Sequence, residues 1–214
     1  AASASLRERQ HALAVAAFVG GQAARALALL RAHLSEYPRD ALALQLATVL
    51  LAFSGPADRR ERLAGLLDDL APAYGDDWWF LGVRAYAYQE HDQLELARSL
   101  AERSLSRRPR NTSAVHALAH VFYETDDHAS GIGFLGDWLG RYPRAAPYYT
   151  HLSWHLALGE LVQGRLESAL ATYDRAIDPA VSSASTTLAD ASSLLWRAEL
   201  YGLAAEPLPW MPVC

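Results

Sequence analysis

Three segments of the chain share one spacing of turn residue, small residue and proline. A residue suited to a turn is followed five positions later by Ala or Gly, and twelve positions after that by proline. A small residue lets two helices approach closely, and proline ends a helix because it lacks a backbone N–H. The small residues of the second and third segments stand 34 residues apart, which is the length of one helical hairpin in repeat proteins. The three sets are Gly21/Ala26/Pro38, Asp92/Ala97/Pro109 and Asp126/Gly131/Pro143.

Helical hydrophobic periodicity runs through almost the whole chain, without the alternation typical of strands. The predicted fold class is therefore all-α, a right-handed solenoid of roughly five stacked antiparallel helical hairpins. We expect residues 6–203 to form one repeat domain, followed by a proline-rich C-terminal tail, residues 204–214, that cannot continue as helix. The predicted helices span residues 6–19, 24–34, 41–53, 59–70, 78–90, 94–106, 112–124, 129–141, 147–163, 166–177 and 186–201.

Three details of this layout are specific enough to test. Residues 41–53 are apolar almost all round, so we expect that helix to be buried. Pro72 is expected to lie beyond the end of the helix that starts at Arg59, because proline interrupts a helix. Asp77 is expected to cap the helix that follows, since aspartate favours that position.

Charge and cysteine content exclude several classes of function. The formal net charge is −5, which argues against a nucleic-acid partner and against an anionic membrane surface. All 19 basic residues are arginine, so a lysine Schiff base is excluded. The single cysteine, Cys214, permits neither an internal disulfide nor a cysteine-rich metal site. The longest apolar run, residues 43–53, is too short to cross a bilayer, and a cytoplasmic, bacterial protein is expected.

The repeat spacing resembles the tetratricopeptide repeat, with Leu118, Ala119 and Phe122 at the packing positions of a first helix. The resemblance implies a concave groove, lined by the first helix of each hairpin, that holds a peptide, a protein or a small ligand. The residues that this register places in the groove are Tyr86, Gln89, His116, His120, Tyr123, His151, Trp154 and Leu158, with His155 one step off that face.

Longer segments resemble one family in particular, the tetratricopeptide repeat protein 38 family, as a shortened member. The most specific are VHALAHVFYE at 115–124 and THLSWHLALGELVQG at 150–164; further matches lie at 6–14, 38–47, 166–174 and 190–202. The chain departs from the family at Leu152, where the family usually has Asn. The resemblance implies the fold and brings no settled activity.

Two pairs of histidines are the strongest candidates for chemistry. Each pair, His116/His120 and His151/His155, is spaced i,i+4, so both imidazoles lie on one face of a helix. The pairs begin 35 residues apart, so they belong to neighbouring repeats and are able to face each other. Neutral imidazoles suit a divalent transition metal such as zinc or iron. Glu124, four residues after His120, is a candidate further ligand or a hydrogen-bond partner of one.

Three interpretations of these histidines remain open. In the leading one the chain is a binding scaffold, and the histidines make ordinary hydrogen bonds between helices. In the second it is a metal-dependent enzyme, although no His-Glu-x-x-His pattern indicates a zinc protease. In the third the histidines act as acid–base catalysts without a metal, with Glu124 or Tyr123 as partner. Asp190 is expected to be a helix-start acid that interacts with the helix dipole, and not a catalytic residue.

A homodimer is a separate expectation. Solenoids whose terminal helices lack a polar outer face often need a covering partner. The apolar helix at 41–53 and the proline-rich tail with Trp210 are the surfaces that a second copy would cover.

Overall fold

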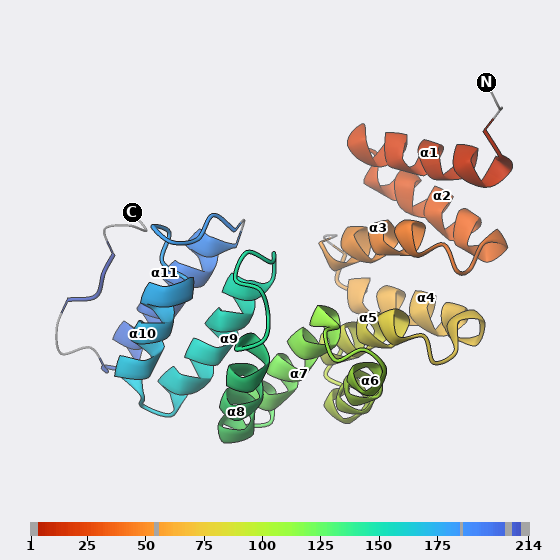
Figure 1. Cartoon of the computed structure of the whole chain (residues 1–214). Coiled ribbons are helices and arrows are strands. Elements are labelled where there is room, and N and C mark those ends of the chain that lie inside the picture. Colours follow the sequence, from red (N-terminus) through yellow and green to blue (C-terminus); the bar gives the residue numbers. More distant parts are fainter. Residues whose placement is uncertain (1–3, 54–55, 185, 204–206, 211–214) are drawn as a thin grey trace.

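The computed structural model describes residues 4–53, 56–184, 186–203 and 207–210, which form eleven helices and no strand. The all-α helical solenoid predicted from the sequence is confirmed (Figure 1). The helices are α1 (Leu6–Val19), α2 (Ala23–Glu36), α3 (Ala41–Ala52), α4 (Arg59–Tyr74), α5 (Trp78–Gln89), α6 (Leu94–Arg107), α7 (Thr112–Glu124), α8 (His128–Leu139), α9 (Tyr149–Val162), α10 (Leu166–Ala176) and α11 (Thr187–Leu200).

The turn residues of the repeat spacing all adopt the left-handed backbone conformation. Gly21, Asp92 and Asp126 have φ of 72°, 56° and 56°. Gly164, at the turn between α9 and α10 and five residues before the buried Ala169, has φ of 70°. Such a residue reverses the direction of the chain sharply, so the second helix of each hairpin packs back against the first. The small residue five positions later then lies in the helix contact, where Ala97 is completely buried. The spacing therefore encodes the hairpins directly.

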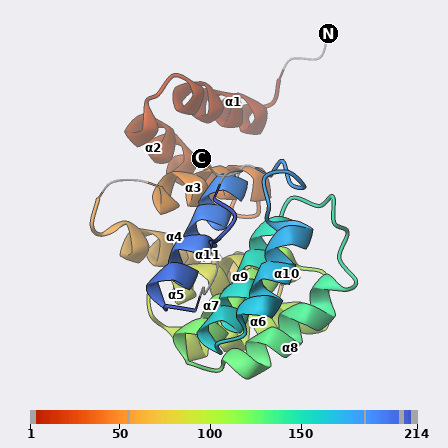
Figure 2. The ribbon, with the colours of Figure 1, turned by 90° about the vertical axis from the view of Figure 1, so that its left-hand side faces the viewer.

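The helices follow an open arc, from α1 at one end to α10 and α11 at the other (Figures 1 and 2). From α1 to α10 each helix packs against the next along the chain. A second set of contacts joins α5 to α7, α7 to α9 and α9 to α11, so these four helices stand side by side. Three adjoining groups of buried apolar side chains form the core along the arc. Side chains on α7 and α9 can therefore face each other across one interface.

Two of the detailed predictions were wrong and one is confirmed. The helix α3 is not buried all round, because Leu42 is 74% exposed and only one side, which includes Leu44, packs into the core. Pro72 lies inside α4, in its last turn, where it removes one backbone hydrogen bond close to the helix end. Asp77 caps α5 as predicted, since its side chain accepts hydrogen bonds from the N–H groups of Trp79 and Phe80.

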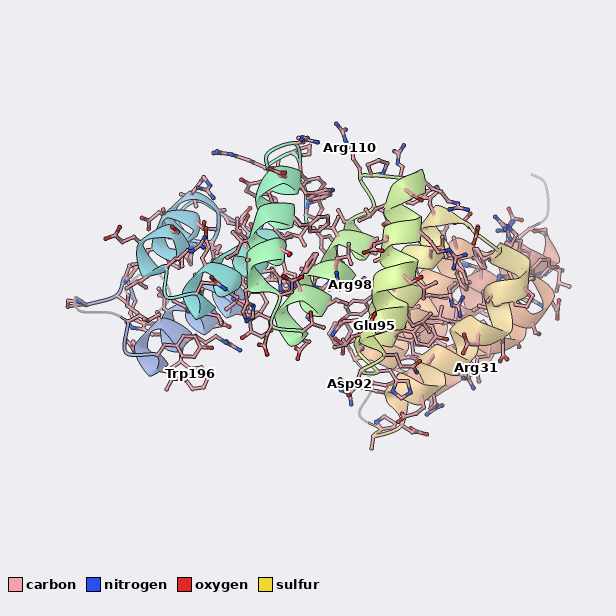
Figure 3. The ribbon with its side chains drawn as sticks, turned by 90° about the horizontal axis from the view of Figure 1, so that it is seen from below. Arg31, Asp92, Glu95, Arg98, Arg110 and Trp196 are labelled. Carbon is pink, nitrogen blue, oxygen red and sulfur yellow. The ribbon has the colours of Figure 1, made fainter. Side chains whose placement is uncertain are left out.

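The outer side of the arc is mainly polar. Figure 3 shows Glu95 and Arg98 in the first half of α6, with Asp92 in the turn before it. Trp196, on α11 at the other end of the molecule, is 56% exposed. The concave side, by contrast, carries His116 and His151.

Candidate metal centre and pocket

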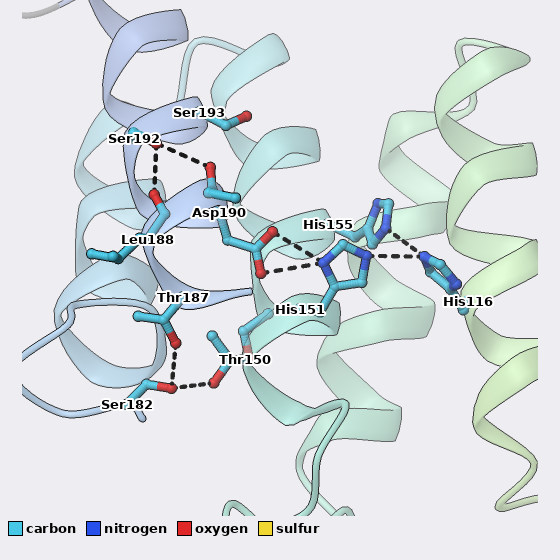
Figure 4. A network of polar contacts seen from close by, with 12 residues as sticks. His116, Thr150, His151, His155, Ser182, Thr187, Leu188, Asp190, Ser192 and Ser193 are labelled. Carbon is cyan, nitrogen blue, oxygen red and sulfur yellow. Dashed lines mark hydrogen bonds and ion pairs between the residues drawn. The ribbon is translucent and has the colours of Figure 1, made fainter. Parts of the chain in front are cut away.

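Four histidines meet where α7 packs beside α9. His116 and His120 project from α7, and His151 and His155 project from α9. The Nε2 atom of His116 lies 3.0 Å from that of His120 and 3.1 Å from those of both His151 and His155. The two pairs therefore face each other, and His116 Nε2 is the atom that the other three approach. Figure 4 shows its contacts with His151 and His155.

Hydrogen bonding alone does not satisfy this arrangement. A neutral imidazole nitrogen carries either a proton or a lone pair, so His116 Nε2 suits one close neighbour and conflicts with the others. A cation that accepts the lone pairs of several imidazoles removes the conflict. Metal–nitrogen bonds of about 2.0–2.1 Å place the nitrogens of a tetrahedral centre about 3.3–3.4 Å apart. The three separations of 3.0–3.1 Å fall within a few tenths of an ångström of that spacing.

Three of the four histidines form the most compact set. His116, His120 and His155 each offer one ligand atom, and these atoms all lie within 4.8 Å of one another. His151 lies beside His116 but outside this set, and its side chain is 22% exposed. The geometry thus gives three deeply placed ligands and a fourth histidine at their edge.

Burial lowers the pKa of the histidines in this set. The pKa of His116 and of His155 is well below the ordinary value of 6.5, first because burial penalises the charged form and then because neighbouring imidazoles repel a second positive charge. The pKa of His120 falls to about 4 for the same reasons. The three rings are therefore neutral near neutral pH, which is the protonation state that binds a metal.

A carboxylate from α11 holds the fourth histidine. The Nδ1 atom of His151 lies 3.1 Å and 3.2 Å from the two carboxylate oxygens of Asp190, which is buried (Figure 4). Because Nδ1–H donates a hydrogen bond to the carboxylate, the lone pair of the neutral His151 ring is on Nε2, on the side of His116. Histidines that bind metals usually have such a partner. Sequence reasoning assigned Asp190 only to the helix dipole, because an acidic residue in a first helical turn has that ordinary role.

Aromatic rings cover the histidines on two sides. The ring of Tyr86 stacks on His116 with centroids 5.4 Å apart, and Trp154 stacks on His151 at 5.3 Å. Burial raises the pKa of Tyr86 to about 12, so its hydroxyl stays protonated. These contacts fix the imidazole planes, and they place Tyr86 and Trp154, two of the three predicted aromatic groove residues, beside the centre.

Two sequence-based assignments need correction, and a third needs an addition. His155 does not line the concave pocket, as expected for a residue one step off the groove face, yet its ring belongs to the compact set. Glu124 is exposed and takes no part in that set, since it is the last residue of α7 and lies beyond the contact with α9. Tyr123 instead packs edge-on against His128 at 5.4 Å and hydrogen-bonds Tyr201.

A pocket of about 480 Å³ adjoins the histidines on the concave side. Most of its apolar side chains come from the α3 segment, α4 and α5, although Gln45 and Thr48 of α3 also line it; α7, α9 and the segments that precede α9 and α11 contribute mainly polar groups. No side chain that lines it, within the described ranges, is a carboxylate or a guanidinium. The residues that line it include Val49, Phe53, Leu63, Val83, His116 and His151.

A second group of ionisable residues has a structural explanation. His33 joins Gln10 through Nδ1 at 2.9 Å and Asp40 through Nε2 at 3.1 Å, with His11 nearby. Arg7 Nε donates to the same carboxylate at 2.8 Å. Burial raises the pKa of Asp40, but the hydrogen bonds from Arg7, His33 and a backbone N–H outweigh it and lower that pKa to about 2. The guanidinium neutralises the carboxylate, so the group connects α1 and α2 to the start of α3 and needs no metal ion for charge balance.

Comparisons with known proteins agree with the architecture. No family model matches the chain. A thermophilic tetratricopeptide repeat protein of Thermus thermophilus superposes with a TM-score of 0.64 at 21% identity, over 88% of this chain and 99% of that one. MamA of Desulfovibrio magneticus RS-1, from its residue 41 to its end, gives 0.61 at 14% identity, over 81% of this chain and 94% of that one.

These likenesses concern the fold. Within the described part of the chain, no helix is long and apolar enough to cross a membrane. The neighbours are helical-repeat proteins, and the arc of hairpins described above is built in the same way. The chain therefore has the helical-repeat scaffold of tetratricopeptide-like proteins.

Proposed function

We propose that this protein is a metal-binding helical-repeat scaffold whose concave pocket presents the metal to a ligand. The observation that carries the proposal is the position of His116 Nε2, with three other imidazole nitrogens at 3.0–3.1 Å. The conflict among their hydrogen-bonding roles disappears when a cation lies between them. The bound species is a divalent transition metal, with zinc and iron as the candidates, because imidazole donors suit both.

Each histidine has a distinct role in this proposal. His116, His120 and His155 are the ligands, since they form the compact set and are neutral near neutral pH. His151 completes the centre when its ring turns slightly toward the metal, and Asp190 orients that ring. Three or four nitrogen donors match the ligand numbers of known zinc sites.

A ligand reaches this centre from the pocket. His116 and His151 both line the cavity, so a small molecule held there lies next to the metal. This contact makes metal-dependent catalysis the second candidate function. A peptide or protein partner on the concave face is compatible with the same scaffold, with one of its side chains entering the cavity.

The first test is metal content. The untagged protein would be purified without chelator and measured by plasma mass spectrometry, beside His116→Ala, His155→Ala and the control His91→Ala. His91 lies at the turn between α5 and α6, apart from the centre. We expect close to one equivalent of a single transition metal in the wild type and in the control, and none in the other two variants.

A folded, metal-free wild type that takes up neither zinc nor ferrous iron in titration would refute the proposal. Loss of metal in all variants, the control included, would also count against it, because the histidines of the centre would then not be the ligands. Circular dichroism of each variant separates loss of metal from loss of fold. Cobalt substitution adds a spectroscopic measure of a tetrahedral nitrogen environment.

Finer assignments follow from the sequence patterns. We infer that the chain is a bacterial, cytoplasmic member of the tetratricopeptide repeat protein 38 family, supported by the segments around the two histidine pairs. Relatives that keep both pairs should then also keep an acidic residue at the position of Asp190. Residues 6–203 act as one domain in this proposal, and light scattering would test for a homodimer. The part of the tail at 204–206 and 211–214 lies outside the described residues.

A further inference from the structure

The pocket beside the histidines has two chemically different ends. Val49 and Phe53 from the α3 segment, Leu63 from α4 and Val83 from α5 supply an apolar end. Gln45 and Thr48 of α3 also line the pocket, and the side formed by α7 and α9 carries His116 and His151 together with uncharged polar groups. A ligand that fills this cavity therefore has an apolar part and a polar part.

The charge at the polar end favours an anionic donor. Neutral imidazoles leave the double positive charge of a divalent cation uncompensated. Among the described residues, the carboxylate that contacts these histidines is that of Asp190, which lies behind His151. In the described lining no guanidinium offers a competing anion site, and no carboxylate repels an anion. A carboxylate oxygen is a common zinc ligand, and it would neutralise part of the metal charge.

The size of the cavity limits the ligand. Its volume of about 480 Å³ lies in the range of pockets that enclose small molecules. The apolar end is bounded by the α3 segment, α4 and α5, so the tail of the ligand lies between these elements while its head reaches α7 and α9.

We propose that the pocket binds a small carboxylic acid with an apolar tail. Its carboxylate coordinates the metal beside His116 and His151, and its tail lies against Val49, Leu63 and Val83. This assignment rests on the proposed function, because the metal supplies the positive charge that selects the acid.

The test is isothermal titration calorimetry of the zinc-loaded full chain with butyrate, hexanoate, octanoate and 1-octanol. Zinc content is measured before any acid is added. We expect the affinity to rise roughly threefold to fourfold for each added methylene that enters the pocket. The alcohol should bind about tenfold more weakly than octanoate, or worse, because it lacks the charge that the metal selects.

Two variants on α3 locate the tail. Val49 is 37% exposed and lines the pocket, whereas Leu42 is 74% exposed and does not. Val49→Asp should weaken octanoate about tenfold or more and change butyrate by less than about twofold. Leu42→Asp, which adds the same charge to the same helix, should leave both acids unchanged.

The outcomes separate this inference from the proposed function. Protein that retains neither zinc nor ferrous iron refutes the metal centre, and this inference with it. Zinc-loaded protein that binds octanol as well as octanoate, or that binds octanoate equally with and without zinc, keeps the metal centre and overturns the carboxylate assignment. Tighter binding of an apolar peptide than of any of the acids overturns the choice of a small molecule.

Discussion

Replacing Asp190 with asparagine should weaken metal binding about tenfold while leaving the fold intact. Both carboxylate oxygens lie within 3.2 Å of His151 Nδ1, so the ring is held by a negatively charged acceptor. Asparagine has nearly the same shape but no charge, and its amide group has to turn its oxygen toward the ring. The substitution therefore changes the support of one histidine without removing a ligand.

The size of the effect follows from the place of His151. Loss of a carboxylate that orients a metal-bound histidine costs about 10-fold to 100-fold in metal affinity. His151 lies at the edge of the compact set, and the other three histidines are unchanged, so we expect the lower end of that range. A tenfold change corresponds to about 1.4 kcal/mol of binding free energy.

Competition with a chromophoric zinc chelator at neutral pH measures this difference. Asp190 also lies in the first turn of α11, where loss of its charge costs about 0.3–1 kcal/mol of folding stability through the helix dipole. Glu167→Gln is the matched control, because Glu167 is an exposed acid in the first turn of α10 and does not contact a histidine. Urea unfolding of metal-free protein gives the dipole effect by itself.

Equal zinc affinity in Asp190→Asn and the wild type would refute the reasoning. The contact between Asp190 and His151 would then be a hydrogen bond between helices with no role at the metal. An equal loss of zinc affinity in Glu167→Gln would also refute it, because the effect would follow helix stability.

Three further predictions concern stability and are measured by urea unfolding. Gly131→Ala should lower the free energy of unfolding by up to about 2 kcal/mol, because the new Cβ would lie 2.9 Å from Phe122 Cβ. Gly133→Ala should raise it by up to about 1 kcal/mol, because its Cβ would meet no atom within 4 Å and alanine favours a helix. If both variants lose stability, the close contact is not the cause. Asp92→Gly should raise stability by about 0.5–1 kcal/mol, since φ of 56° strains a residue with a Cβ; a loss would contradict the turn geometry. The pKa of Asp40 is lowered to about 2, so its stabilising effect is complete above the ordinary value of 3.8 and is lost as the pH falls toward 2. The wild type should thus lose about 1–2 kcal/mol relative to Asp40→Asn between pH 4 and pH 2, after screening at the half-exposed guanidinium, and parallel pH curves would rule this out.

The hairpins were predictable because their signals are local. A left-handed turn residue and a small residue five positions later act within one hairpin, and both lie in the printed sequence. The exposure of α3 was not predictable, because an apolar helix is buried only where neighbours cover it, and α3 turns one side toward the concave pocket. Pro72 misled for a related reason, since a proline near a helix end costs one hydrogen bond and does not stop the helix.

The histidine centre was predictable in part. The i,i+4 spacing placed each pair on one helix face, and the repeat length brought the pairs to neighbouring helices. Whether they face each other depends on how α7 rotates against α9, which a one-residue shift would change by about 100°. Asp190 comes from a third helix, 39 residues beyond His151, and no sequence pattern around it indicates that it contacts a histidine. Glu124 fits the i,i+4 spacing from His120, but it is the last residue of α7 and is exposed.

The separation of these residues along the chain has a consequence for synthesis in the cell. The ribosome makes α7 first, then α9, whose His151 follows His116 by 35 residues, and α11 later still. While the chain emerges, it carries one histidine pair, then two, and only at the end the carboxylate that orients His151. In the proposed protein the three deeply placed ligands come together once α9 has docked on α7, so a metal can enter at that stage. Docking of α11 then strengthens metal binding about tenfold, because Asp190 orients His151.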